Sequence, residues 1–376
     1  MMLKKLFFII FTTKIIFKKP KKTKILLFDK ITEDFFLESK IKYKYKILDT
    51  RLETINFWIF IKTLSNFKFS FKYYCIFYIQ ACNPKLLITT ADNVALFYQL
   101  KKYFKDTKFI SIQNGYRFRY QRNFKNFSKL VKEGHDLSSD FIFLFGKSIA
   151  NFYKKFLKFK PVILGSYRNN CVKISKKNMI KNGILYISGW RKKKSWFDPV
   201  LEKQIVSSIA KFCSKKKIKF YILPLSKNKG TKYSENVSEE YEFFKKSLKS
   251  IKFRFLNKMK SSDTYRIIDR FNLITFIDST LGYESISRGK KIVSFSVRKC
   301  ENSKLENFGF PEFKKKRGFF FTTERSEKEF SRILNNTWSI SKGEWKRKYL
   351  KKLNKIMVYN SQNKKILNTI NKILGK

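Results

Sequence analysis

One unit recurs along the chain: a short apolar run, then a polar or glycine-containing loop, then a longer stretch with helical spacing. In the first half, the apolar runs lie at residues 25–28, 45–48, 86–88, 109–112, 141–145 and 162–164. Short continuous apolar strands that alternate with helices are typical of a parallel sheet covered on both faces. The pattern therefore predicts a doubly wound α/β domain over residues 21–170.

A second set of these units follows, with apolar runs at residues 184–187, 220–223, 253–256, 273–277 and 291–295. We expect a second doubly wound domain over residues 183–340, joined to the first by a linker at 171–182. Ligands of open α/β sheets bind beyond the carboxyl ends of the strands, so the loops after the runs should face a central cleft. Residues 341–376 have helical spacing and are predicted to pack back across both domains, with a free-standing surface helix as the alternative.

The charge balance is extreme, with 84 Lys and Arg against 28 Asp and Glu and a formal net charge of +56. A basic surface attracts the phosphates of nucleic acid. The Lys residues are scattered, however, and Lys, Phe, Ile and Asn, which have A/T-rich codons, are all abundant, so a mutational bias explains the charge. We expect no specific nucleic acid as a partner; the charge favours an anionic membrane surface or an acidic substrate.

The amino-terminal segment needs a separate interpretation. Residues 6–17 are apolar except for two Thr and one Lys, and Lys residues flank them on both sides. A spanning helix needs about 20 apolar residues, and a basic run stands where a signal peptide would be cleaved. We expect residues 1–20 to form an amphipathic helix in the membrane interface, with a helix packed on the first domain as the alternative. The protein would then be cytoplasmic and peripheral to the inner face of the cytoplasmic membrane.

His135 is the only histidine. A single histidine excludes every site that needs two, including the usual zinc and non-haem iron sites. We therefore expect neither a metal nor a cofactor.

The most informative stretch is residues 276–295. A strand is predicted to end at Asp278 and a helix to begin near Leu281, which places several backbone N–H groups at a positive helix end suited to a diphosphate. Gly282 has no Cβ and would let the ligand approach the backbone, and Glu284 would accept hydrogen bonds from the hydroxyls of a ribose. The predicted donor-binding residues of this turn are Ser279, Thr280, Leu281, Gly282 and Glu284. An ordinary strand-to-helix turn capped by Ser or Thr is the alternative.

This turn resembles the donor domain of GT-B glycosyltransferases, which use nucleotide sugars. Their Asp-Ser-x-x-Gly-x-Glu pattern is matched by Asp278, Ser279, Gly282 and Glu284, and Lys291 replaces the Pro of their Gly-Lys-Pro-like strand start. A wider resemblance, to a bacterial family of surface carbohydrate biosynthesis proteins, covers most of the chain and rests on residues 47–53, 83–93, 112–115, 165–170 and 185–190. The resemblance implies two Rossmann-like domains that face a central cleft.

Other polar residues follow the predicted strands and complete the candidate site. On the donor side they are Ser188, Gly189 and Arg191, of which Arg191 is a candidate partner for the donor phosphate. On the acceptor side they are Asp49, Arg51, Asn93, Gln113, Asn114 and Asn170, for which a salt-bridged loop or a simple turn is the alternative. Asp92 is the first candidate for a general base and His135 the second; Asp92 as a helix N-cap is the alternative.

Together these features predict an enzyme of surface polysaccharide biosynthesis that transfers a sugar from a nucleotide-sugar donor to a glycan or lipid-linked acceptor. A sugar-nucleotide epimerase or a polyol-phosphate transferase on the same fold is a close alternative. A non-catalytic basic protein that binds nucleic acid or membrane is the alternative from a different class.

Overall fold

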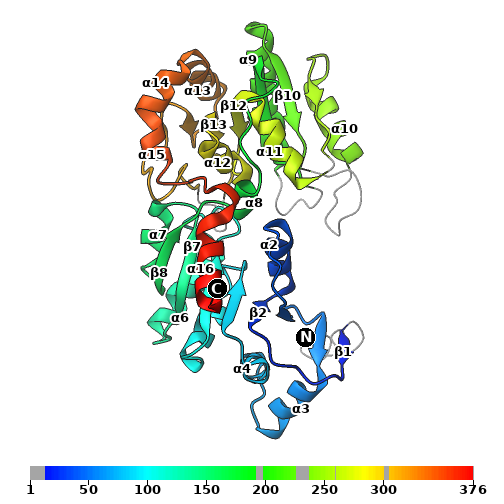
Figure 1. The fold of residues 1–376 in the computed structure, drawn as a ribbon. Helices are drawn as coiled ribbons and strands as arrows, with labels where there is room; N and C mark the ends of the chain where they lie inside the picture. Colours follow the sequence, from blue (N-terminus) through cyan, green and yellow to red (C-terminus); the bar gives the residue numbers. More distant parts are fainter. Residues whose placement is uncertain (1–12, 192–197, 226–236, 259, 300–304, 376) are drawn as a thin grey trace.

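Two six-stranded parallel sheets form the core of the computed structural model (Figure 1). The structure describes residues 13–191, 198–225, 237–258, 260–299 and 305–375. The first sheet has the order β3-β2-β5-β6-β7-β8 and the second has the order β11-β10-β9-β12-β13-β14. The prediction of two doubly wound α/β domains is confirmed.

Each predicted apolar run overlaps a strand, but β8 and β9 begin four residues before their runs, and β9 therefore begins inside the predicted linker 171–182. The first sheet contains β2 (Ile25–Phe28), β3 (Lys46–Leu48), β5 (Leu86–Thr89), β6 (Lys108–Ile112), β7 (Ser138–Leu144) and β8 (Lys158–Ile163). The second contains β9 (Ile180–Ile187), β10 (Lys219–Leu223), β11 (Arg254–Phe255), β12 (Phe271–Phe276), β13 (Lys291–Phe295) and β14 (Phe321–Thr322). The sequence analysis missed β14, although residues 319–321 are a short apolar run.

Helices cover both faces of each sheet. Alternate residues of each strand point to opposite faces, and on each face they pack with helices in a separate apolar cluster. Those of the first domain are η1 (Lys30–Thr32), α2 (Glu33–Glu38), α3 (Phe57–Ser65), α4 (Phe71–Cys82), α5 (Ala95–Leu100), η2 (Lys101–Tyr103), α6 (Arg122–Lys132), α7 (Lys147–Tyr153) and α8 (Tyr167–Asn170). Those of the second domain are α9 (Pro199–Lys215), α10 (Val237–Leu248), α11 (Ser261–Asp269), α12 (Thr280–Ser287) and α13 (Glu327–Ser339).

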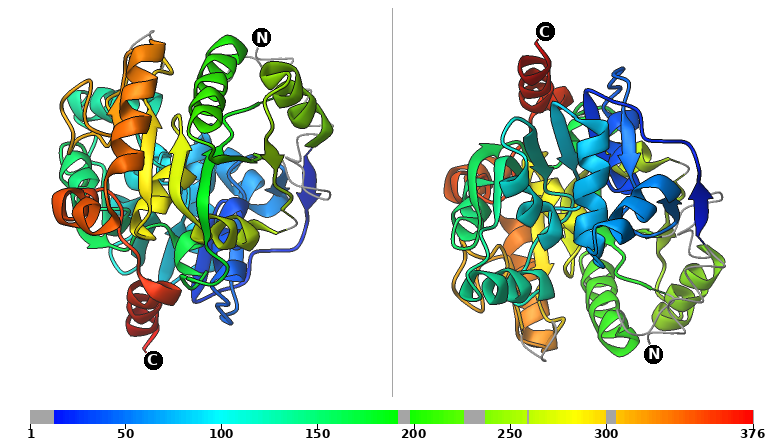
Figure 2. Two further views of the ribbon diagram at one scale, coloured as in Figure 1. Left: turned by 90° about the horizontal axis from the view of Figure 1, so that it is seen from above. Right: turned by 90° about the horizontal axis from the view of Figure 1, so that it is seen from below.

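The carboxyl-terminal segment crosses from the second domain to the first. It contains α14 (Lys342–Trp345), the π-helical η5 (Lys346–Leu350), α15 (Lys351–Leu353), η6 (Ser361–Asn363) and α16 (Lys364–Leu374). Trp345 packs in a cluster with strands of the second sheet, whereas Ile366 and Ile370 pack against strands of the first. Seen from below in Figure 2, α16 lies beside the first sheet. The crossing passes so close to Gly146 that a Cβ there would lie 2.2 Å from the Lys355 carbonyl oxygen.

The described end of the amino-terminal segment is a strand and not the predicted helix. β1 (Lys14–Ile16) pairs in parallel with β4 (Thr54–Asn56), and the Lys14 amide donates to the Glu53 carbonyl over 3.0 Å. The helix prediction is therefore wrong for the described residues 13–20, none of which is helical; β-branched Ile15 and Ile16 suit an extended strand. Residues 1–12 of that prediction lie outside the described residues.

Candidate active site

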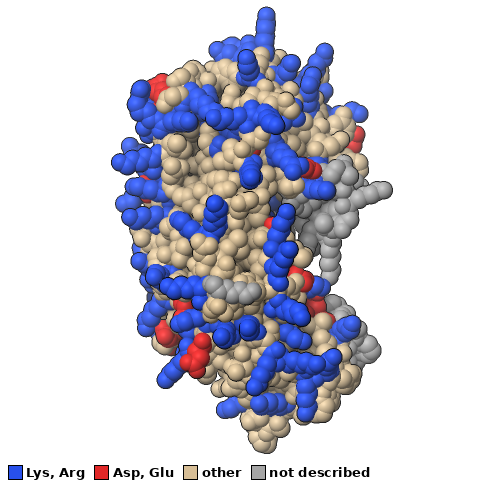
Figure 3. Space-filling model, in the orientation of Figure 1, with Lys and Arg blue, Asp and Glu red and all other residues tan. Residues whose placement is uncertain are grey.

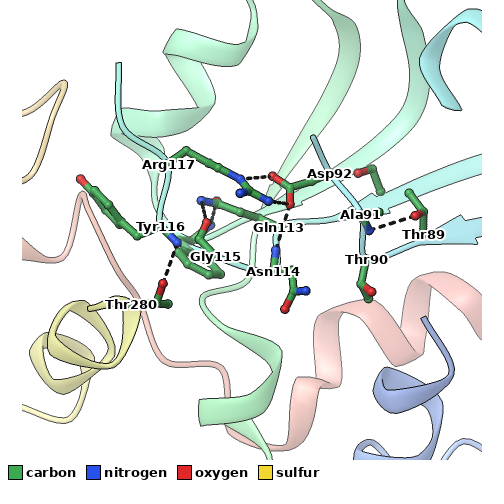
Figure 4. Close-up of polar contacts among 12 residues, drawn as sticks. Thr89, Thr90, Ala91, Asp92, Gln113, Asn114, Gly115, Tyr116, Arg117 and Thr280 are labelled. Atoms are coloured by element: carbon green, nitrogen blue, oxygen red, sulfur yellow. Dashed lines mark hydrogen bonds and ion pairs between the residues drawn. The ribbon is translucent and has the colours of Figure 1, made fainter. Parts of the chain in front are cut away.

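The candidate site lies where the carboxyl edges of the two sheets face each other. In the first sheet the strand order reverses between β2 and β5, and in the second it reverses between β9 and β12. Ligands of open α/β sheets bind at such switch points. The edges touch where the Tyr116 amide, after β6, donates to Thr280 Oγ1 at the start of α12 over 3.0 Å (Figure 4).

Aromatic stacking reinforces this contact between the domains. The Tyr116 ring lies parallel to the Tyr283 ring with their centroids 3.6 Å apart, and Tyr283 stacks in turn on Phe308 at 5.3 Å. The Tyr116 hydroxyl donates to the Phe310 carbonyl over 2.8 Å. Protein side chains thus fill this part of the crevice and fix the domains against each other.

The strand-to-helix turn of the second domain is built as predicted, but two of its roles differ. Ser279 caps α12 by accepting a hydrogen bond from the Leu281 amide at 3.3 Å, and its carbonyl accepts from the Gly282 amide at 2.9 Å. A Cβ on Gly282 would lie 2.2 Å from the Phe276 ring. Gly282 is therefore required for packing against β12 and not for the approach of a ligand. Of the four predicted amides, those of Ser279 and Thr280 are the better candidates for a diphosphate.

Glu284 joins the two domains. Its Oε1 accepts a hydrogen bond from the Ser166 hydroxyl, in the loop after β8, and its Oε2 accepts one from the Tyr265 hydroxyl of α11 over 3.0 Å. Burial of the carboxyl group raises the pKa of Glu284 to about 7. Both oxygens that were predicted to hold a ribose thus have protein partners in this arrangement.

An arginine that the sequence interpretation missed lies at the switch point of the second sheet. Arg298 follows β13 and donates to both carboxylate oxygens of Asp278, at 2.9 and 3.0 Å. Its guanidinium lies 3.7 Å from Oε2 of Glu202, a fully buried residue of α9. The rule that singles out residues after a strand would have found Arg298, which stands three positions beyond the last residue of β13.

The remaining donor-side residues surround this cluster. The Gly189 amide donates to Glu202 Oε1 over 2.8 Å, and a Cβ on Gly189 would lie 2.7 Å from Glu202 Oε2. Burial raises the pKa of Glu202 to about 7. Ser188 is buried and accepts from the Trp190 amide over 3.1 Å. Arg191 donates to the Trp190 carbonyl over 2.8 Å, beside a stretch outside the described residues.

Asp92 has the environment of a structural ion pair. It is fully buried and accepts two bonds from the Arg117 guanidinium and one from the Asn114 amide at 3.2 Å (Figure 4). It also accepts one from the Tyr153 hydroxyl at 2.6 Å. A general base needs an oxygen that can reach the acceptor hydroxyl, and these partners occupy both oxygens. The N-cap alternative is also wrong, because Val94 occupies the N-cap of α5.

His135 lies at the wrong edge of the first sheet for catalysis in the crevice. It is exposed in the loop between α6 and β7. This loop precedes the amino end of β7, whereas the crevice is formed at the carboxyl ends of the parallel strands. The structure therefore contradicts the catalytic role predicted for His135.

The predicted acceptor-side residues divide into two groups. Gln113 and Asn114 lie at the crevice: Gln113 accepts from the Phe145 amide and donates to the Gly115 carbonyl, both at 2.9 Å, and Asn114 accepts from Arg168. Arg168 is a second arginine of the crevice that the sequence interpretation missed. Asn170 is buried instead against the carboxyl-terminal segment and donates to Asn363 over 2.9 Å. Its predicted place in the cleft is wrong.

The loop after β3 holds its predicted residues mainly through internal bonds. Asp49 accepts from the Arg51 amide at 2.9 Å and from the Thr54 amide at 2.8 Å. Arg51 Nε donates to Asp29 Oδ2 over 3.1 Å. The salt-bridged-loop alternative describes this region. Asn93 is exposed beside Asp92.

Comparison with known proteins identifies the family. The sequence model of a family described as "putative O-antigen biosynthesis protein" matches residues 110–374, which is well over half of the chain. The chain belongs to this family. No curated protein matches it.

The chain is similar in fold to several solved structures. A co-structure of MnaA from S. aureus with UDP is 12% identical, has a TM-score of 0.52 and is matched over 96% of this chain and 97% of that chain. Sucrose-phosphate synthase from Thermosynechococcus elongatus is 8% identical, with a TM-score of 0.50 and coverage of 95% of this chain and 100% of that chain. The fold is GT-B-like, with two Rossmann-like domains, as the sequence resemblance implied.

Three further features of the described residues concern a cavity, metal-type side-chain clusters and membrane-spanning helices. A cavity of about 740 Å³ lies away from the crevice, between α6 and α7, and Lys125, Lys129 and Phe156 are among the residues that line it. Within the described ranges, no three or more His, Cys, Asp and Glu side chains gather as they would around a metal ion. Among the described helices, none combines the length and the apolar character needed to cross a membrane.

Proposed function

We propose that the protein binds a nucleotide-sugar donor at the switch point of the second sheet and transfers the sugar to a glycan or lipid-linked acceptor in surface polysaccharide assembly. The observation that carries the proposal is Arg298, which Asp278 holds at the carboxyl edge of the sheet beside the start of α12. Its Nε is buried and has no hydrogen-bond partner within the described part of the chain. A fixed guanidinium next to a positive helix end is suited to a diphosphate.

The proposed chemistry breaks the bond between the anomeric carbon and the diphosphate oxygen and forms a bond between that carbon and the acceptor hydroxyl oxygen, whose proton passes to a base or to water. Arg298 and the amides of Ser279 and Thr280 would stabilise the negative charge that develops on the leaving diphosphate. The acceptor hydroxyl would approach from the first domain, past Asn114 and Arg168. Asp92 is a positioning residue in this scheme, because it fixes Arg117 and the Asn114 amide.

Calorimetric titration of the full chain with UDP, CDP and GDP sugars tests the donor site. Arg298→Gln should lower the affinity for whichever nucleotide sugar binds to wild type by about tenfold or more, because a hydrogen bond to a charged group contributes roughly 1.5–3 kcal/mol. Arg298→Lys should keep part of the affinity, since it keeps the charge but not the fork. Chromatography of the products from donor and acceptor together separates transfer from epimerisation of the donor.

A matched control is Arg332→Gln. Arg332 is also a partly buried arginine paired with a carboxylate, but its partner is Glu329, on its own helix α13. Thermal unfolding of each variant shows whether the Arg298 variants stay folded. Equal nucleotide affinity of folded Arg298→Gln and of wild type, or no binding of any nucleotide by wild type, would overturn the donor assignment.

We further propose that the protein works peripherally on the inner face of the cytoplasmic membrane, where a lipid-linked acceptor would lie. The net charge of +56 supports this proposal, because the inner face carries anionic lipid. On the face drawn in Figure 3, Lys and Arg side chains are spread from one end of the molecule to the other. Charge alone therefore does not identify which surface would meet the membrane.

A further inference from the structure

Exposed apolar side chains concentrate at one end of the first domain. Nine of the sixteen large hydrophobic side chains exposed in the described ranges come from two short segments: Ile15, Ile16, Phe17, Trp58, Phe60, Ile61, Leu64, Phe67 and Phe69. Phe67 is 81% exposed and Phe69 is 74% exposed. We call these nine residues the α3 surface. Soluble proteins rarely expose a contiguous apolar patch unless it meets a partner or a membrane.

The helix α3 itself has an unusual distribution of side chains. Of its nine residues, Ile59 and Thr63 are the buried ones, and they form a single stripe one turn apart. Phe60, Ile61 and Leu64 lie outside that stripe and are exposed. Six of the nine residues of α3 are apolar and only Lys62, Thr63 and Ser65 are polar. Apolar side chains on most sides of a helix belong in an apolar environment, which the described part of the chain supplies to α3 only in part.

The two segments of the α3 surface are continuous in space. The Phe17 ring lies 5.2 Å from the Phe57 ring, and the Trp58 indole N–H donates to the Phe17 carbonyl. After α3, the loop turns back on the helix, where the Phe67 amide donates to the Leu64 carbonyl over 2.9 Å. The rings of Phe67 and Phe69 lie 6.4 Å apart.

The sequence segments that form this surface carry charge of one sign. No Asp or Glu occurs in residues 1–28 or 54–91. Lys19 lies over the Trp58 ring at 4.6 Å, Lys68 over the Tyr73 ring at 5.2 Å, and Lys62 over the Phe77 ring at 5.2 Å. At the lower end of Figure 3, over α3, tan surface is surrounded by Lys and Arg side chains.

We infer that the α3 surface docks on an anionic lipid bilayer, with the aromatic rings in the interface and the Lys side chains on the headgroups. Aromatic and aliphatic side chains interleaved with Lys are the composition of interfacial membrane anchors. A second copy of the chain is a poorer occupant, because a symmetric contact would bring two acid-free Lys clusters together. The inference refines the membrane part of the proposed function and does not depend on the transfer reaction.

Flotation of the full chain with vesicles tests the inference. We expect binding to phosphatidylcholine vesicles that contain phosphatidylglycerol and much weaker binding to phosphatidylcholine alone. Phe67→Asn with Phe69→Ser should reduce binding by about a hundredfold, because each ring favours an apolar phase by roughly tenfold or more. Asn is chosen because Phe67 has a φ of 53°, in the left-handed region that Asn tolerates.

The matched control is Leu37→Ser with Val200→Ser, which removes two apolar side chains that are 67% and 77% exposed elsewhere on the molecule. This control should float as wild type does. Equal flotation of the Phe67/Phe69 variant and the control would overturn the inference and move the membrane contact to another segment. A failure of the wild-type protein to float would also overturn the inference. The same holds if sedimentation shows that wild type is a dimer and the Phe67/Phe69 variant a monomer. Nucleotide titration of the same variant should match wild type, so the outcomes for membrane and donor stay separate.

Discussion

Asp92→Asn is the substitution that separates a structural role of Asp92 from the roles suggested by its sequence position. The Asp92 carboxylate is fully buried, and the side chain of its partner Arg117 is 14% exposed. Asparagine keeps the shape but not the charge, so it leaves the Arg117 guanidinium buried without a counter-charge. Removing one partner of a buried ion pair costs about 3–5 kcal/mol. Because domains are stable by only about 5–15 kcal/mol, the variant should be markedly destabilised.

The assay is urea unfolding of the full chain, followed by far-ultraviolet circular dichroism. Arg117→Met and the double variant complete a mutant cycle. The double variant should be more stable than Asp92→Asn alone, because it removes the unpaired charge together with its partner. An N-cap role predicts that Asp92→Asn is nearly silent. Wild-type stability of Asp92→Asn, or no recovery in the double variant, would refute the ion-pair reasoning.

Two further predictions concern the second domain. Burial raises the pKa of Glu284 from 4.5 to about 7. The unfolded chain therefore loses this proton at a lower pH than the folded chain, and this group lowers the free energy of unfolding as pH rises from 4.5 to 7. Glu284→Gln should flatten that fall in urea titrations at a series of pH values, and an unchanged pH dependence would contradict this reasoning. Gly282→Ala should cost about 1–3 kcal/mol of unfolding free energy through overpacking against Phe276. Gly343→Ala is the control and should cost little, because its Cβ would lie 4.0 Å from its nearest neighbour, Ser341 Oγ. Equal thermal stability of the two variants would count against the packing argument.

The two sheets could be predicted from the sequence because each buried parallel strand is a continuous apolar run. Residues 25–28 and 291–295 were predicted as strands, and β2 and β13 have those bounds. The start of α12 was predicted within one residue, since Ser279 is a good N-cap after a strand. Such features depend on neighbours in the sequence, which a reader of the sequence can see.

The roles of the polar residues after the strands could not be predicted in the same way, because their partners are distant in the sequence. Glu284 is bonded to Ser166, which is 118 residues away, and Asn170 to Asn363, which is 193 residues away. Placing a residue at the crevice edge needs only the strand pattern. Deciding whether its side chain faces a ligand or another part of the protein needs the tertiary contacts.

This distinction indicates where selectivity for a donor would reside. At the contact between the domains, Thr280 and Glu284 are bonded to residues of the first domain, so a ligand there would have to compete with protein partners. At the switch point of the second sheet, Asp278 fixes Arg298 while the buried Nε of Arg298 and Oε2 of Glu202 lack hydrogen-bond partners among the described residues. Leaving buried polar atoms unsatisfied costs about 1–3 kcal/mol each. A bound nucleotide sugar that forms hydrogen bonds to these atoms would recover this energy. The side of the crevice that holds Arg298 should therefore determine which nucleotide sugar binds.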